Sequence, residues 1–122
     1  MKSKSYASEL LRAVGMSPKY KGYAYVLHML DLAVEDISRT QNMSLRLYAL
    51  TCEHYHVSPI TVERNARFAI RRTWEADHSR RMHRLFEEYG IFYAPTNREF
   101  ICVLADCASC KSTTASMQMC MW

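Results

Sequence analysis

The chain has 122 residues, of which 49% are hydrophobic and 23% charged, which suits one globular domain and disfavours two independent ones. Only three glycines and three prolines interrupt stretches of good helix formers, so we predict an all-α fold rather than a sheet. A net charge of +4 is too small to indicate a nucleic-acid partner unless the positive charge is concentrated on one surface.

Apolar residues spaced three and four positions apart predict a short first helix and a long second one. The first should end at Gly15 and Pro18 and contain Leu10, Leu11 and Val14. The second begins near residue 22 and is expected to be the main core helix. Its predicted buried face consists of Tyr23, Val26, Leu27, Leu30, Ala33, Val34 and Ile37.

A third run of helical spacing follows Ser44 and covers about three turns. Its apolar positions are Leu45, Tyr48, Ala49, Cys52 and Tyr55. Residues 56 and 57 then form a tight connection to the next predicted helix.

The stretch from residue 58 to 74 carries strong helix signals. Ser58 is a good N-cap, Pro59 suits the first helical position, and Val57 is placed to pack against Val62 as a hydrophobic staple. At about 100° per residue, one side of the helix collects Val62, Ala66, Ala69, Ile70 and Thr73. The opposite side collects Thr61, Arg64, Arg67, Phe68 and Arg71, with Glu63 and Asn65 on the two borders.

Two further helices are predicted toward the carboxyl end. They run from about residue 78 to 89 and from 96 to about 108, and a loop with Gly90 and Pro95 separates them. Residues 109–122 have no helical period, so we predict a flexible tail after a domain that covers residues 1–108. The expected architecture is a six-helix, bundle-like domain.

The third and fourth predicted helices with their short connection have the form of a helix-turn-helix, in which the second helix enters the DNA major groove. Arginine can donate two hydrogen bonds to guanine and glutamate can accept one from cytosine, so we expect Thr61, Glu63 and Arg64 to face bases. Phosphate contacts are expected from Ser58, Arg67 and Arg71. The alternative is a solvated basic face on which Arg67 and Arg71 pair with acidic neighbours.

Residues 5–108 resemble the C-terminal DNA-binding domain of the response regulator that initiates sporulation in endospore-forming bacteria. The resemblance rests on blocks in the same order and nearly the same spacing: Lys21-Gly22-Tyr23, Val62-Glu63-Arg64, Ala69-Ile70, Trp74, Pro95-Thr96-Asn97, Glu99-Phe100 and Ala105-Asp106. It implies a six-helix effector domain that binds a promoter box as tandem domains or a dimer and contacts RNA polymerase. It also implies base contacts by Glu63 and Arg64 and a phosphate contact by Arg67.

Three positions on or beside the reading face depart from the family pattern. Thr61 stands where the family usually has arginine, Phe68 where it has histidine, and Asn65 where an alanine packs. Loss of one arginine contact relaxes specificity at that base by about 1 to 3 kcal/mol, so we expect the preferred box to have drifted. Phe68 can contact a thymine methyl group or a partner protein.

The family's phosphate-accepting receiver domain has no counterpart before residue 5, so we expect either an excised domain or a stand-alone paralogue regulated by its abundance or by partners. The amino end lacks the apolar core of a secretory signal, and no run of about 18 uncharged apolar residues occurs. Five cysteines, an odd number without a regular framework, suit a reducing compartment. We therefore expect a cytoplasmic protein without membrane association.

The cysteines Cys102, Cys107, Cys110 and Cys120 have a spacing that is superficially similar to an iron–sulfur ligand set. We instead expect Cys102 and Cys52 to be small core residues. Cys107 and Cys110 form a more reactive pair, suited either to weak metal binding or to redox chemistry.

Other polar clusters give weaker signals. The histidines His54, His56, His78 and His83 form no convincing zinc or catalytic set and are expected mostly at the surface. A second basic cluster is either a phosphate-facing flank or a solvated face, and it consists of Arg80, Arg81 and Arg84. Because no phosphate loop or nucleophile elbow occurs, we expect no enzyme activity, cofactor or metal.

The sequence therefore predicts a DNA-binding transcriptional regulator that reads a sporulation-type box through residues 59–74. Its expected partners are double-stranded DNA, RNA polymerase and a second copy of the chain. The alternative is an interaction module of the same fold that does not read DNA and pairs with the full-length regulator or the polymerase. That alternative is motivated by Thr61, Asn65 and Phe68.

Overall fold

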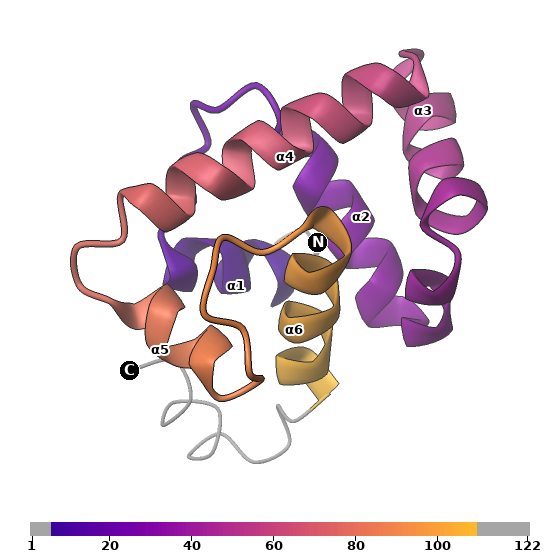
Figure 1. Ribbon diagram of the computed structural model, residues 1–122. Coiled ribbons are helices and arrows are strands. Elements are labelled where there is room, and N and C mark those ends of the chain that lie inside the picture. Colours follow the sequence, from indigo (N-terminus) through magenta and orange to yellow (C-terminus); the bar gives the residue numbers. More distant parts are fainter. Residues whose placement is uncertain (1–5, 110–122) are drawn as a thin grey trace.

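The computed structural model describes residues 6–109 (Figure 1). Within this range the chain forms six α-helices and no strand, which confirms the all-α prediction. The α-helices are α1 (Tyr6–Val14), α2 (Tyr23–Glu35), α3 (Ala49–Tyr55), α4 (Pro59–Glu75), α5 (Arg81–Glu87) and α6 (Asn97–Ser109). Between α2 and α3 lie a 3₁₀ helix, η1 (Ile37–Gln41), and a π-helix, η2 (Met43–Tyr48). Most of the predicted tail, residues 110–122, lies outside the described range.

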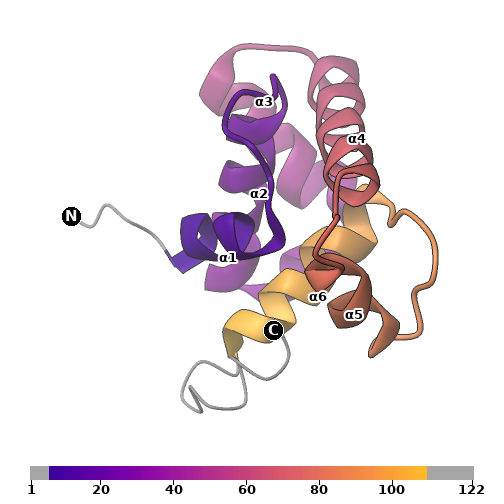
Figure 2. The ribbon, with the colours of Figure 1, turned by 90° about the vertical axis from the view of Figure 1, so that its left-hand side faces the viewer.

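The hydrophobic core lies where α2 and α6 pack against each other at the centre of the bundle (Figure 1). Buried side chains from α1, α2, η2, α4, α5 and α6 join in one cluster, and α3 adds only the partly buried Cys52. The rings of Phe86 on α5 and Phe100 on α6 stack in it with centroids 5.9 Å apart. In the two views α4 lies at the edge of the molecule, so one of its sides remains open to solvent (Figures 1 and 2).

The first two helices lie close to the predicted ranges. Gly15 has a φ of 89° and ends α1, since that left-handed conformation carries almost no steric penalty for glycine. On α2 the buried residues are Val26, Met29, Leu30 and Ala33. The prediction that Ile37 belongs to this buried face is wrong, because α2 ends at Glu35 and Ile37 is 51% exposed in η1.

The predicted face of the third helical run is also wrong. Its buried residues are Leu47 and Thr51, whereas Leu45 is 68% exposed and Tyr55 36%. The physical reason is η2, whose hydrogen bonds join residue i to residue i+5 rather than i+4 and so shift the inward phase of the following turns. Cys52 is half-buried against the core, so it is only partly the core residue expected.

The fifth helix begins three residues later than predicted. Arg80 has a φ of 63°, which breaks the helical path before residue 81. The Asp77 carboxylate accepts a hydrogen bond from the backbone N–H of His83 (2.8 Å) and thereby satisfies a donor in the first turn. None of the helices in residues 6–109 is both long and apolar enough to cross a membrane.

Candidate nucleic-acid interface

The start of α4 is the most strongly specified point of the candidate interface. His56 ends α3 in a left-handed conformation (φ 57°), and the chain then turns into the extended Ser58. The Ser58 hydroxyl oxygen accepts a hydrogen bond from the backbone N–H of Thr61 at 3.2 Å, and Pro59 occupies the first turn. The predicted N-cap is confirmed, and Val57 and Val62 both pack against the core as expected of a hydrophobic staple.

The two sides of α4 are separated as predicted. The buried residues are Val62, Ala66, Ala69, Ile70 and Thr73. The exposed positions include Arg64, Arg67, Phe68 and Arg71, and Glu63 and Asn65 are half-buried along the borders. Thr61, predicted on the exposed side, is half-buried as well. The small buried side chains let α4 approach the core closely, and the basic side chains project away from it.

A close backbone approach holds α4 against α2. A Cβ atom added to Gly22 would lie 2.1 Å from the carbonyl oxygen of Asn65, 2.4 Å from its carbonyl carbon and 2.9 Å from the nitrogen of Ala66. These distances leave no room for any side chain larger than hydrogen. Asn65 turns its amide along its own helix and donates to the Thr61 carbonyl oxygen (2.9 Å), so it stays at the border.

One ion pair lies on the basic face. Arg67 Nη1 is 2.7 Å from Glu63 Oε2, with the two side chains 51% and 37% exposed. A pair with this exposure contributes less than about 1 kcal/mol and can be exchanged for other partners. Arg64 and Arg71 have no ion-pair partner among residues 6–109, so the acidic pairing expected in the solvated-face alternative is present for Arg67 and absent for Arg71.

Phe68 is an exposed apolar side chain on this otherwise basic face. Its ring is 52% exposed, and the Arg72 guanidinium carbon lies 5.7 Å from the ring centroid. Ile60, two residues after the N-cap Ser58, is 65% exposed on α4 as well. The helix therefore presents two apolar groups to solvent beside its arginines.

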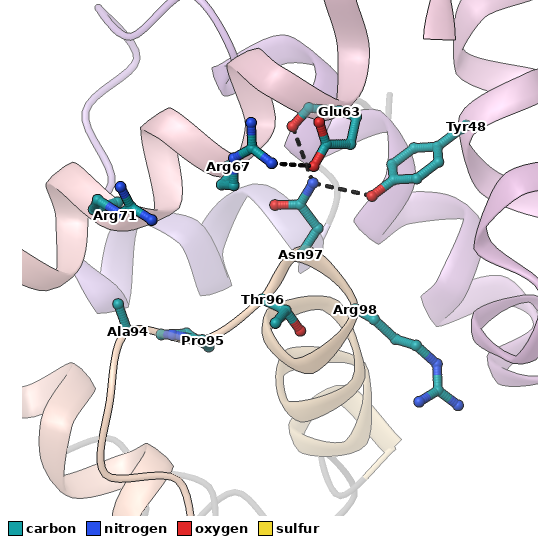
Figure 3. Close-up of a pocket in the computed structure, with 9 residues that line it drawn as sticks. All are labelled: Tyr48, Glu63, Arg67, Arg71, Ala94, Pro95, Thr96, Asn97 and Arg98. Carbon is teal, nitrogen blue, oxygen red and sulfur yellow. Dashed lines mark hydrogen bonds and ion pairs between the residues drawn. The ribbon is translucent and has the colours of Figure 1, made fainter. Parts of the chain in front are cut away.

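Asn97, which the sequence did not single out as a site residue, anchors the other flank of α4 (Figure 3). Its side-chain Nδ2 donates to the backbone oxygen of Glu63 (3.1 Å) and to the Tyr48 hydroxyl (3.0 Å), and the residue is only 6% exposed. Burial raises the pKa of Tyr48. A capping box fixes this end of α6, because Thr96 and Glu99 each accept a hydrogen bond from the other's backbone N–H (3.1 and 3.0 Å).

A comparison with known protein families identifies the family to which this helical domain belongs. Residues 7–107 match the family described as "Sporulation initiation factor Spo0A C terminal". The chain belongs to this family. The family consists of DNA-binding effector domains of a sporulation regulator, so the resemblance noted from the sequence is confirmed over nearly the whole described range.

The second basic cluster of this family member lies on and before α5. Arg80, Arg81 and Arg84 are exposed, and Arg80 Nη2 lies 3.4 Å from Glu87 Oε2. His54, His56 and His78 are exposed, as expected for most of the histidines, and His83 is the exception with a side chain that is only 18% exposed. Its Nδ1 lies 2.8 Å from the Asp77 carboxylate, and its ring centroid lies 3.6 Å from that of Trp74. This contact joins the end of α4 to α5.

The predicted cysteine environments are partly reversed. Cys107 is buried, and its sulfur lies 3.9 Å from the Tyr89 hydroxyl, whereas Cys102 is half-buried. Cys110 and Cys120 lie outside the described residues, so the proposed reactive pair stays a prediction. Among residues 6–109, no group of three or more histidine, cysteine or acidic side chains is arranged to hold a metal ion.

Proposed function

We propose that the outer side of α4 reads a sporulation-type promoter box in the major groove of double-stranded DNA. The main support is the separation of the two sides of this helix: Arg64 and Arg71 are exposed and unpaired in the described chain, while the opposite side is buried. A helix at the edge of the molecule can enter the groove without a rearrangement of the core (Figure 2).

In this proposal Thr61, Glu63 and Arg64 contact bases. Arg64 donates two hydrogen bonds to one guanine, and Glu63 accepts from a cytosine amino group. The ion pair between Glu63 and Arg67 is exposed and weak, so both side chains can leave it to contact DNA. Arg67 then exchanges its carboxylate partner for a DNA phosphate. The remaining contacts are phosphates for Ser58 and Arg71 and a thymine methyl group for Phe68.

The test compares Arg64→Ala with Arg71→Ala in titrations against the box and a scrambled duplex at two salt concentrations. Arg64→Ala should lose about 1 to 3 kcal/mol of discrimination and keep its salt dependence largely unchanged. Arg71→Ala should weaken binding to both duplexes alike and reduce the slope of log affinity against log salt by about 1. Equal affinity of the unmutated chain for both duplexes contradicts sequence reading.

A second candidate is an interaction module that pairs with the full-length regulator, RNA polymerase or another copy of the chain. The observation that favours it is the exposure of Phe68 (52%) and Ile60 (65%) on α4, because a protein partner can bury apolar side chains that the charged DNA backbone cannot. Co-purification of a partner after nuclease treatment, with no protection of the box in footprinting, supports this candidate. Phe68→Ser should abolish that co-purification if the contact is made through this ring.

A further inference from the structure

A pocket of about 310 Å³ lies between α4 and the amino end of α6 (Figure 3). Arg67 and Arg71 line it from α4, and Pro95 and Asn97 line it from the loop and the start of α6. Its size suits a small ligand rather than a macromolecular segment. The lining combines positive charge with one deeply buried amide, and these two features define the ligand that would fit.

The charge of the pocket favours an anion. Glu63 also lines the pocket, but its carboxylate is paired with Arg67 at 2.7 Å, so these two charges largely cancel. Arg71 and Arg98 also line the pocket and have no ion-pair partner in the described chain, so positive charge is in excess there. The first turn of α6 adds the partial positive charge of a helix amino end, where the capping box of Thr96 and Glu99 occupies two backbone N–H groups and leaves those of Asn97 and Arg98 for a ligand.

The Asn97 amide adds a second requirement. Its two amide hydrogens are donated to the Glu63 carbonyl oxygen and the Tyr48 hydroxyl, and the former partner can only accept, which fixes the orientation of the amide. Its Oδ1 is buried without a hydrogen-bond partner in the described protein and points toward the side of the pocket lined by Arg67 and Arg71 (Figure 3). A buried acceptor of this kind requires a group that donates a hydrogen bond, and a ligand in the pocket can supply one.

From these contacts we infer that the pocket binds a phosphate group that carries an O–H donor, either hydrogenphosphate or a small phosphomonoester with a neighbouring hydroxyl. The phosphate oxygens accept from Arg71 and the end of α6, while the O–H donates to Asn97 Oδ1. Sulfate has a similar shape and charge but no hydrogen at neutral pH, and a DNA phosphodiester also lacks one. The pocket should therefore discriminate against both.

The site also regulates DNA binding, an extension that rests on the proposed function. A phosphate in the pocket occupies Arg71, which the proposal assigns to the DNA backbone. Ligand and DNA then compete for the same guanidinium group. Direct binding of phosphate by the isolated chain does not depend on any role in DNA reading.

The direct test titrates the chain at pH 7 and constant ionic strength with inorganic phosphate and, separately, with sulfate. The side-chain amide signals of Asn97 in proton–nitrogen correlation spectra report whether the ligand binds at this residue. Phosphate should shift the Asn97 amide signals and bind roughly tenfold more tightly than sulfate, since sulfate leaves a buried acceptor unpaired. Equal affinities, or no shift of the Asn97 signals at saturation, overturn the proposal.

Three variants locate the site. Arg71→Gln should weaken phosphate binding at least several-fold, whereas Arg84→Gln, which removes the same charge from exposed α5, should not. Asn97→Ala should make the affinities for phosphate and sulfate similar, with thermal unfolding measured in parallel because Asn97 also anchors α4. If Asn97→Ala does not fold, two other results decide whether the pocket binds phosphate: the ratio of phosphate to sulfate affinity in the unmutated chain, and the effect of Arg71→Gln. Equal weakening by Arg71→Gln and Arg84→Gln contradicts a localised site.

Further ligands identify the source of the bound phosphate group and its effect on DNA binding. Tighter binding of glycerol 3-phosphate than of inorganic phosphate assigns the site to a hydroxyl-bearing ester, and the reverse assigns it to free phosphate. Dimethyl phosphate that binds as well as inorganic phosphate overturns the proposal, because the pocket is then an ordinary contact for the DNA backbone. Replacement of sulfate by phosphate at equal ionic strength should weaken DNA binding. Unchanged DNA affinity at phosphate saturation refutes the competition but leaves the direct binding result intact.

Discussion

The two helices of the helix-turn-helix are held to the rest of the fold by different means. α4 buries a regular stripe of small and aliphatic side chains along its length. The segment before it, η2 with α3, buries only Leu47 and Thr51 and leaves Leu45 68% and Leu50 36% exposed. α4 is therefore fixed by continuous packing, whereas its partner depends on a few contacts.

Rings supply much of the attachment of α3. His28 on α2 stacks on His54 with centroids 4.5 Å apart, and both rings meet Tyr55 edge-on. A hydrogen bond of 2.9 Å joins His28 Nδ1 to the Thr51 hydroxyl. The comparison teaches that α4 is held by continuous apolar packing while α3 rests on polar and titratable contacts, which makes the attachment of α3 the more sensitive of the two.

Leucine truncation in η2 tests this asymmetry with the largest expected effect. Leu47→Ala removes a fully buried side chain and should lower the free energy of unfolding by about 2 to 5 kcal/mol. Leu45→Ala, two residues earlier and 68% exposed, should change it by less than about 0.5 kcal/mol. Chemical denaturation of both variants provides the comparison. A larger loss at Leu45 would mean that the inward phase of η2 is the one predicted from the sequence.

The same contrast explains which parts of the fold could be predicted. α4 has a clear cap, a proline in its first turn and an uninterrupted 3.6-residue period, so its range and both faces follow from local rules. In residues 43–48 the helical repeat changes from the α to the π type, and no glycine or proline marks the change. Hydrogen bonding from residue i to residue i+5 has no signature among those local rules.

The candidate site divides in a similar way. Exposure of Arg64 and Arg71 follows from their positions on α4, and the Glu63–Arg67 pair follows from a spacing of four residues. Asn97 contacts Glu63 across 34 positions of the chain, and no local pattern encodes that contact. The spacing of Thr96 and Glu99 does indicate a capping box and hence the start of a helix, but not which helix that start would meet.

Gly22 tests how tightly α4 is fixed. Its φ of −81° suits any residue, so Gly22→Ala carries no conformational penalty, and its effect comes from the clash with the backbone of Asn65. Overpacking of this kind should lower the free energy of unfolding by about 1 to 3 kcal/mol and also weaken DNA binding, since α4 must move. Gly90→Ala is the control: it meets no atom within 4 Å but has a φ of 78° and should cost about 1 kcal/mol without affecting DNA binding. Unchanged DNA affinity in Gly22→Ala would show that α4 shifts without consequence.

The N-cap of α4 should contribute less. Ser58→Ala removes the acceptor for the Thr61 N–H and should lower the free energy of unfolding by about 1 kcal/mol. Ser58→Asn preserves an acceptor and should retain most of the stability. Thermal unfolding of the three proteins measures the difference. If alanine and asparagine are equally destabilising, the start of α4 is held by the packing of Val57 and Val62 against the core and not by the cap.

Acid should loosen the attachment of α3 by the smallest amount. Burial, followed by the neighbouring His54, lowers the pKa of His28, while Asp31 acts in the opposite direction. The unfolded chain therefore takes up more protons than the folded one as the pH falls below about 6.5, so the free energy of unfolding decreases with falling pH. The loss should stay below about 1 kcal/mol, since the ring is only half-buried and solvent screens its charge.

Thermal unfolding between pH 7.5 and 5 measures this effect. The unfolding temperature of His28→Gln should fall less steeply with pH than that of the unmutated chain. His78→Gln, at an exposed position outside the ring cluster, should follow the unmutated chain. Parallel curves for all three proteins would place the acid sensitivity elsewhere and leave α3 no more sensitive than α4.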